Sequence, residues 1–362
     1  MQLLEKFMLK YRSVIFAMLI LASFSNAYAQ FVPVPSDENS DGATTPPNLK
    51  VLKTIPSAPF EDLNGLQTPE ETASGKTARV RIKEIDDAAW LPFGAFQRGQ
   101  YLKAMELALS RAQLRDPAAQ TLIAELFAEG FGVGRSMDDA VFWYDQAAKN
   151  GDPAAQYKLA LLLTDGRYIE RNDDRARELM KQSAEAGNAK AQFNFAQLLV
   201  AEKPGPVGIR EALPFFEKSA ARGIPDAQYA LSQIYINALD VDDAKRAIAR
   251  RHLIAAARAG YDTARLDLAI WLIDGVGGDR DFEAGFEWMS LAALKGNVIA
   301  QNRLAHLYIQ AIGTRGNPIE AGKWYIISRR AGLEDASLED FYQGLTVEEQ
   351  KASLAAANEL RF

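Results

Sequence analysis

Apolar residues recur at helical spacing along most of the chain, and small residues recur at a second, longer period. The dipeptide Ala119-Gln120 or a close variant returns every 36 or 37 residues, and a glycine closes each interval. The dipeptides are Ala119-Gln120, Ala155-Gln156, Ala191-Gln192, Ala227-Gln228, Ala264-Arg265, Ala300-Gln301 and Ala336-Ser337, and the glycines are Gly151, Gly187, Gly223, Gly260, Gly296 and Gly332. A period of this length with helical patterning predicts a stack of helix pairs.

The unit at residues 116–150 shows how one pair is built. Pro117 suits the first turn of a helix, and apolar residues at helical spacing predict that this helix runs over 116–129. Gly130 allows a tight turn, and Asp138 or Asp139 opens a second helix, whose inner face we expect to comprise Ala140, Trp143, Ala147 and Ala148. A small residue in each first helix lets the paired helix approach closely, and these residues are Ala124, Ala160, Ala196, Ser232, Ala269 and Ala305.

The run Gly-x-Gly-Val, Asp, Ala, Trp-Tyr, Ala-Ala, Gly and Ala-Gln resembles the Sel1-like repeat, a branch of the tetratricopeptide-type solenoids. Residues 119–154 match this pattern nearly throughout, and residues 264–299 and 300–335 match it well. Residues 155–263 keep the recurring dipeptides and glycines but depart from the pattern at the turns. Residues 93–112 resemble an ordinary tetratricopeptide unit. The resemblance implies an all-α fold, a right-handed solenoid of stacked antiparallel helix pairs.

The N-terminal region lacks the repeat. A basic start, an apolar run over 13–24 and the sequence Ala27-Tyr28-Ala29 predict a secretory signal peptide, cleaved between Ala29 and Gln30. An uncleaved anchor is the alternative interpretation, although the apolar run is short for a membrane span. Residues 30–78 hold seven of the fifteen prolines and predict a disordered linker, which serves either as a spacer or as a tether or proline-rich ligand.

The chain therefore divides into five expected parts. These are a signal peptide (1–29), a proline-rich linker (30–78), N-terminal helices with the tetratricopeptide-like unit (79–118), six Sel1-like repeats (119–335) and C-terminal capping helices (336–362). In the last part, Thr346-Val347-Glu348-Glu349 has the pattern of a capping box that opens a final helix. Solenoids need such an end helix to cover the last apolar face.

Composition narrows the possible chemistry. The chain has no cysteine and two histidines, which excludes disulfides, thiolate nucleophiles and zinc–thiolate sites. It has 41 basic and 47 acidic residues, a net charge of −6, and residues 30–362 alone carry −8. A mildly acidic chain is a poor non-specific binder of nucleic acid. We therefore expect no catalytic residue, no cofactor, no metal site and no nucleic-acid partner.

Three motifs resemble functional sites without requiring one. Gly130-x-Gly132-x-Gly134 follows a helix rather than a strand, so a turn explains it better than a phosphate loop. The acidic pairs Asp138-Asp139, Asp173-Asp174 and Asp242-Asp243 precede or open second helices, where negative charge complements the helix dipole. His252 takes a slot that holds an aromatic or leucine elsewhere, which predicts a packed ring, whereas His306 could line a groove.

If the resemblance sets the register, the first helix of each pair faces the concave side. The middle repeats then present tyrosine and phenylalanine in a row, flanked by aliphatic residues. The predicted partner groove comprises Tyr157, Leu161, Phe193, Tyr229, Ile236, Leu266, Ile270 and His306. Grooves that combine apolar anchor residues with a polar rim bind peptides or amphipathic helices. The alternative is that tight superhelical curvature buries these rings as core.

The function favoured by these features is a non-catalytic scaffold or adaptor in the bacterial periplasm. We expect it to bind a peptide or helix of an envelope or signalling protein, with no stable membrane insertion after signal cleavage. One alternative is a secreted effector or virulence-type factor that binds a host protein. Another is a hydrolase of cell-wall material, which no clustered motif supports.

Overall fold

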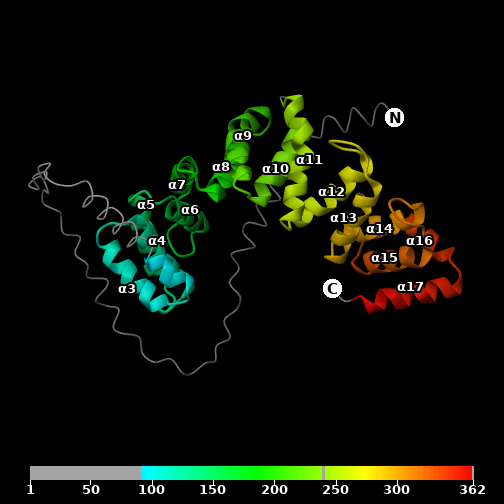
Figure 1. Cartoon of the computed structure of the whole chain (residues 1–362), viewed down its shortest axis with the longest axis horizontal. Coiled ribbons are helices and arrows are strands. Elements are labelled where there is room, and N and C mark those ends of the chain that lie inside the picture. Colours follow the sequence, from blue (N-terminus) through cyan, green and yellow to red (C-terminus); the bar gives the residue numbers. More distant parts are fainter. Residues whose placement is uncertain (1–90, 239–240, 361–362) are drawn as a thin grey trace, which may run out of the picture. The chain divides into compact units, whose positions relative to one another are not determined.

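The computed structural model describes residues 91–238 and 241–360 (Figure 1). The predicted signal peptide, the predicted linker and residues 79–90 lie outside the described residues. The described part of the chain contains helices and turns and no strand, which confirms the all-α solenoid class. It forms two compact units, an N-terminal unit at 91–188 and a C-terminal unit at 189–360.

The N-terminal unit is a series of antiparallel helices in which each packs on the next. After a helical segment at 91–97, the helices are α3 (Tyr101–Ala112), α4 (Pro117–Glu129), α5 (Met137–Lys149), α6 (Pro153–Asp165) and α7 (Asp173–Glu185). The predicted helix over 116–129 is confirmed as α4, which Asp116 caps by accepting hydrogen bonds from two backbone N–H groups. Gly130 ends it with a φ of 74°.

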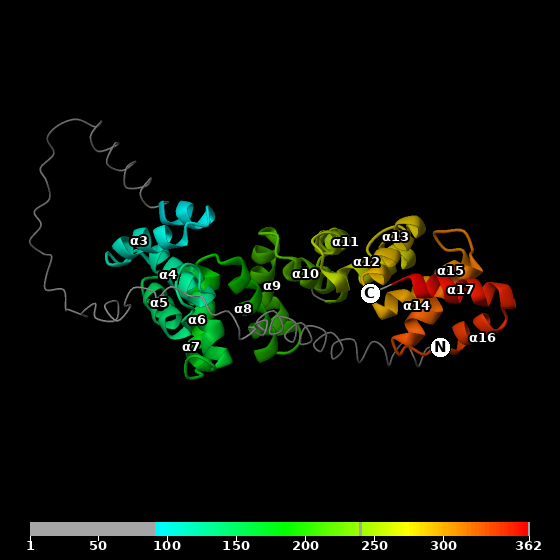
Figure 2. The ribbon, with the colours of Figure 1, turned by 90° about the horizontal axis from the view of Figure 1, so that it is seen from below.

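The C-terminal unit continues the same pattern (Figure 2). Its helices are α8 (Ala189–Glu202), α9 (Pro206–Ala221), α10 (Pro225–Asn237), α11 (Asp243–Arg258), α12 (Asp262–Asp274), α13 (Phe282–Leu294), α14 (Val298–Gln310), α15 (Pro318–Arg330), α16 (Ala336–Gln343) and α17 (Val347–Glu359). Helix α17 packs on α15 and begins at the predicted capping box, in which Thr346 and Glu349 bond each other's backbone N–H groups.

The small residue predicted in each first helix lies in the core. All six of these side chains are 0% exposed: Ala124, Ala160, Ala196, Ser232, Ala269 and Ala305. The inner face of α5 is buried as predicted. The acidic pairs also lie where expected, because Asp138-Asp139 and Asp173-Asp174 occupy first turns and Asp242 caps α11.

The glutamine of the repeated dipeptide has a structural role that its spacing alone did not reveal. Its side-chain amide donates to the backbone carbonyl eight residues earlier, at the end of the preceding helix. These bonds run from Gln120 to Ala112 (3.2 Å), Gln156 to Ala148 (3.4 Å), Gln228 to Ala220 (2.6 Å) and Gln301 to Ala293 (3.2 Å). Each of these carbonyls lies at a helix C-terminus and also accepts the backbone N–H three residues later, so the glutamine adds a second donor to it. We call this bond the amide seam between consecutive helix pairs.

Candidate partner-binding face

The first helices of the repeat pairs, here called the A helices, carry all eight predicted groove residues. The A helices are α4 and α6 in the N-terminal unit and α8, α10, α12 and α14 in the C-terminal unit. Tyr157 and Leu161 lie on α6 and are half-buried. In the C-terminal unit, Tyr229, Ile236, Ile270 and His306 are half-buried, whereas Phe193 and Leu266 are buried.

The structure corrects the expectation of an open apolar strip at Phe193 and Leu266. The Phe193 side chain is 7% exposed, and its ring packs edge-on against Phe216 of α9 with centroids 5.8 Å apart. Leu266 is 8% exposed and belongs to a core cluster with Leu304 and Trp324. These two side chains pack between helices, so only the other six predicted residues can offer surface to a partner.

A hydrogen-bonded cluster on α10 and α12 was missing from the sequence prediction. The hydroxyl of Tyr229 and the side-chain amide of Gln233 both donate to Oδ2 of Asp267, over 2.9 and 3.1 Å. Burial raises the pKa of the Asp267 carboxyl, an effect that the Tyr229 hydrogen bond and the charge of Arg303 partly oppose. The one available signal was an acidic residue between two leucines, Leu266 and Leu268, in the middle of an A helix.

His306 is held by the helix that follows in the array. Its Nε2 lies 2.9 Å from Oδ2 of Asp335, the residue that caps α16, and Asn302 donates to the same oxygen over 3.1 Å. Burial acts to raise the pKa of Asp335, but hydrogen bonds from His306, Ser337 and Asn302 outweigh it and hold the pKa well below its usual range. His306 therefore tethers α14 to the start of α16.

This tether predicts an acid-sensitive contribution to stability. A carboxyl whose pKa is depressed in the folded state stabilises above its unfolded value near 3.8, and that stabilisation is lost as the pH falls toward the folded value. We expect Asp335→Asn to lower the melting temperature at pH 7 by about 2–4 °C, or roughly 1 kcal/mol, and by less than half of that at pH 2. Asp340→Asn, an exposed carboxylate on the same helix, is the control. A difference between wild type and Asp335→Asn that stays constant from pH 7 to pH 2 would contradict the assignment.

The A helices of the N-terminal unit carry an ion pair. Nζ of Lys158 on α6 lies 3.3 Å from the Glu125 carboxylate on α4. This pair occupies the polar positions next to Tyr157 and Leu161. The accessible apolar side chains of α6 are therefore flanked by a compensated pair of charges.

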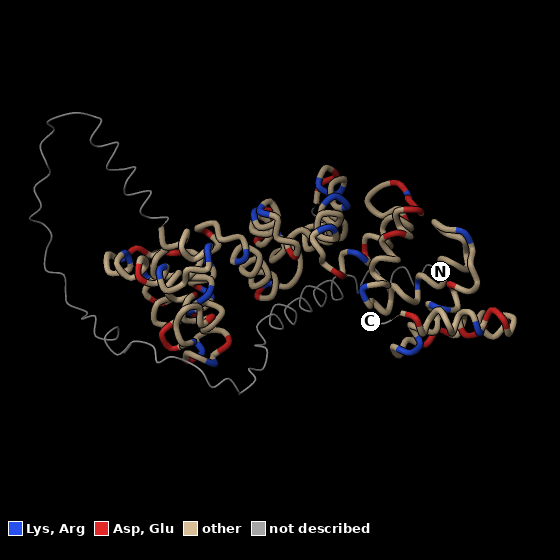
Figure 3. The backbone as a smooth tube through the Cα atoms, turned by 60° about the horizontal axis from the view of Figure 1, so that its bottom comes forward, with Lys and Arg blue, Asp and Glu red and all other residues tan. Residues whose placement is uncertain are grey.

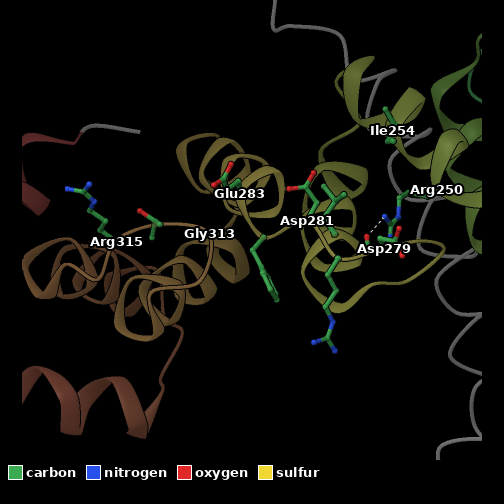
Figure 4. Close-up of a pocket in the computed structure, with 11 residues that line it drawn as sticks. Arg250, Ile254, Asp279, Asp281, Glu283, Gly313 and Arg315 are labelled. Carbon is green, nitrogen blue, oxygen red and sulfur yellow. Dashed lines mark hydrogen bonds between the residues drawn. The ribbon is translucent and has the colours of Figure 1, made fainter.

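An open hollow lies beside the turn between α12 and α13. Arg250, one of its lining residues, holds this turn in place. Arg250 of α11 donates to the backbone carbonyls of Val276 (2.6 Å), Gly278 (2.9 Å) and Asp279 (2.7 Å). Figure 4 shows Arg250 and Asp279 side by side at this hollow. Because these carbonyls engage the guanidinium, Arg250 fixes the turn. The acidic side chains around it are exposed to solvent.

His252 packs as predicted. Its ring lies edge-on to Tyr235 with centroids 5.4 Å apart, and Nδ1 is 2.5 Å from Oε1 of Gln228. In the part of the chain that the structure describes, no group of three or more His, Asp or Glu side chains could hold a metal ion. Figure 3 shows basic and acidic residues interspersed along both units. None of the described helices is long and apolar enough to cross a membrane.

The family model of the Sel1 repeat matches five segments of the chain. These are residues 117–152, 153–188, 225–261, 263–297 and 298–333. Six repeats were expected, and the segment between the second and third matches holds the helix pair α8–α9. A search among curated proteins gives no match.

Several solved structures resemble this fold, and two of them show the likeness. A Sel1 repeat protein from Oxalobacter formigenes is 26% identical, with a TM-score of 0.55, and the match covers 69% of this chain and 99% of that one. A protective antigen of uropathogenic Escherichia coli with an SLR fold is 23% identical, with a TM-score of 0.58. The match covers 71% of this chain but 55% of the antigen, so the chain spans about half of that protein.

Proposed function

Because the chain belongs to the Sel1-repeat family of α-solenoid proteins, we propose that it is a non-catalytic scaffold that captures a peptide or helix of another protein on its A helices. Sel1-repeat proteins are generally scaffolds for protein–protein interaction. The observation that carries the proposal is the half-buried state of Tyr229, Ile236 and Ile270, which lie beside hydrogen-bonding groups. Apolar anchors with adjacent polar groups are how such surfaces hold peptides.

The compartment that we propose is the periplasm, and the partner an envelope or signalling protein. The basic start, short apolar run and Ala27-Tyr28-Ala29 of the N-terminal sequence support export. Export also supports the second candidate, a secreted effector that binds a host protein. Fractionating cells into periplasm and culture medium separates the two, because only an effector accumulates in the medium.

A crosslinking experiment tests capture by the A helices. The full chain would be expressed in cells with a photoreactive amino acid at Tyr229 or at Ile270, and captured proteins identified and then purified for direct binding. Leu294, 51% exposed on α13, is the control position. We expect one partner to be captured from Tyr229 and Ile270, and its affinity to fall at least tenfold in the Tyr229→Ala, Ile270→Ala double variant. Equal capture from Leu294, or unchanged affinity of the double variant, would overturn the proposal.

A further inference from the structure

Asp267 is an acidic side chain without a counter-charge. It lies on the A helix α12 and is largely buried, and its two hydrogen bonds come from neutral groups, Tyr229 and Gln233. No Lys, Arg or His nitrogen of the described residues lies within 4 Å of its carboxylate. By contrast, Glu125 faces Lys158 on the equivalent surface of the N-terminal unit. Buried charges in proteins are ordinarily paired with an opposite charge, and the described residues do not supply one for Asp267.

Two tyrosine rings lie next to this carboxylate. Tyr229 and Tyr261 are both half-buried, and their ring centroids are 5.0 Å apart with an interplanar angle of 33°. Burial and the negative charges of Asp226 and Asp267 raise the pKa of Tyr261 to about 12, which shows that its ring lies in the field of two carboxylates. Aromatic faces attract cations, and nearby carboxylates add to that attraction.

The fold places one candidate counter-charge near the cluster but not in contact with it. Arg303 of α14 is exposed, and its charge acts on Asp267 from beyond ion-pair distance. Oδ1 of Asp267 receives no hydrogen bond from the described residues, since both donors bind Oδ2. One carboxylate oxygen is therefore free for a charged donor.

We propose that Tyr229, Tyr261 and Asp267 form a cation subsite that takes an arginine or lysine side chain of the captured peptide. The inference rests on the proposed scaffold function and adds to it the chemistry of one partner residue. The bound cation donates to Oδ1 of Asp267 and lies against the tyrosine rings, so that an ion pair and a cation–π contact act together. The half-buried Ile236 and Ile270, on the same two A helices, leave room for apolar neighbours in the peptide.

The test uses the full 362-residue chain and four peptide pools. Each pool is degenerate at the flanking positions and fixed at the centre as arginine, lysine, citrulline or norleucine, of which citrulline is the neutral counterpart of arginine. We expect wild type to bind the arginine and lysine pools at least tenfold more tightly than the citrulline and norleucine pools. Asp267→Asn should bring all four pools within about twofold of one another, whereas Asp274→Asn, an exposed carboxylate on the same helix, should keep the preference.

Two further variants keep the test decisive. Tyr261→Leu, which leaves Asp267 intact, should reduce the preference severalfold even if Asp267→Asn folds poorly. Arg303→Gln should preserve or increase the preference, because it removes the competing positive charge. Binding of all pools without regard to charge would overturn the cation subsite and leave the scaffold function standing. Failure of every pool to bind would overturn both, and a preference that persists in Asp267→Asn and Tyr261→Leu would overturn the subsite alone.

Discussion

Gly313→Ala should destabilise the C-terminal unit by about 3 kcal/mol or more. Gly313 has a φ of +67°, and an added Cβ would lie 2.0 Å from the backbone carbonyl oxygen of Phe282 and 2.8 Å from Cβ of Phe286. The backbone of α13 cannot yield as a flexible side chain would. Thermal unfolding of the variant should show a midpoint about 6–12 °C below that of wild type.

Gly296→Ala is the matched control for this prediction. Gly296 has a φ of +87°, but nothing lies within 4 Å of the position that its Cβ would take. Its substitution therefore costs only the left-handed backbone penalty, about 1–2 kcal/mol. Equal losses in the two variants would show that the turn containing Gly313 does not press against α13 in solution.

Phe193→Ala should destabilise the protein by about 3–4 kcal/mol, because it removes a buried ring and leaves a cavity against Phe216. Urea denaturation measures this loss. Val207→Ala, on the neighbouring helix α9 and 54% exposed, should cost less than about 0.5 kcal/mol. A Phe193→Ala variant that unfolds like wild type but no longer binds its partner would contradict the core position of Phe193 and show that its ring contacts the partner.

Local signals were enough to predict the helices of the array. The helix at 117–129 begins after Asp116 and Pro117 and ends at Gly130, and all of these are features of consecutive residues. The capping box at Thr346 is equally local. The small residue that recurs once in each A helix predicted where the helices pack most closely, because only a small side chain permits that approach.

The candidate site was less predictable because equivalent positions have different neighbours. Phe193 and Tyr229 occupy the same register, yet Phe193 packs against Phe216 while Tyr229 directs its hydroxyl to Asp267. Whether such a ring is covered depends on side chains from the adjacent helices, which the repeat pattern does not specify. Arg250 was also missed, since its carbonyl acceptors lie 21–29 residues later, in α12 and in the turn that follows it.

Because of the amide seam, each period of the sequence contains both the donor and the acceptor of one junction between helix pairs. Its donor and acceptor are eight residues apart, so a segment of one full period that is duplicated or deleted carries a complete junction with it. Two junctions depart from this bond. Arginine replaces glutamine at Arg265, whose buried Nε has no hydrogen-bond partner, and serine replaces it at Ser337, whose hydroxyl donates to Asp335. Recombination between repeats can thus lengthen or shorten the chain by whole periods without disturbing the junctions that remain, which lets such a protein change its reach in a single genetic event.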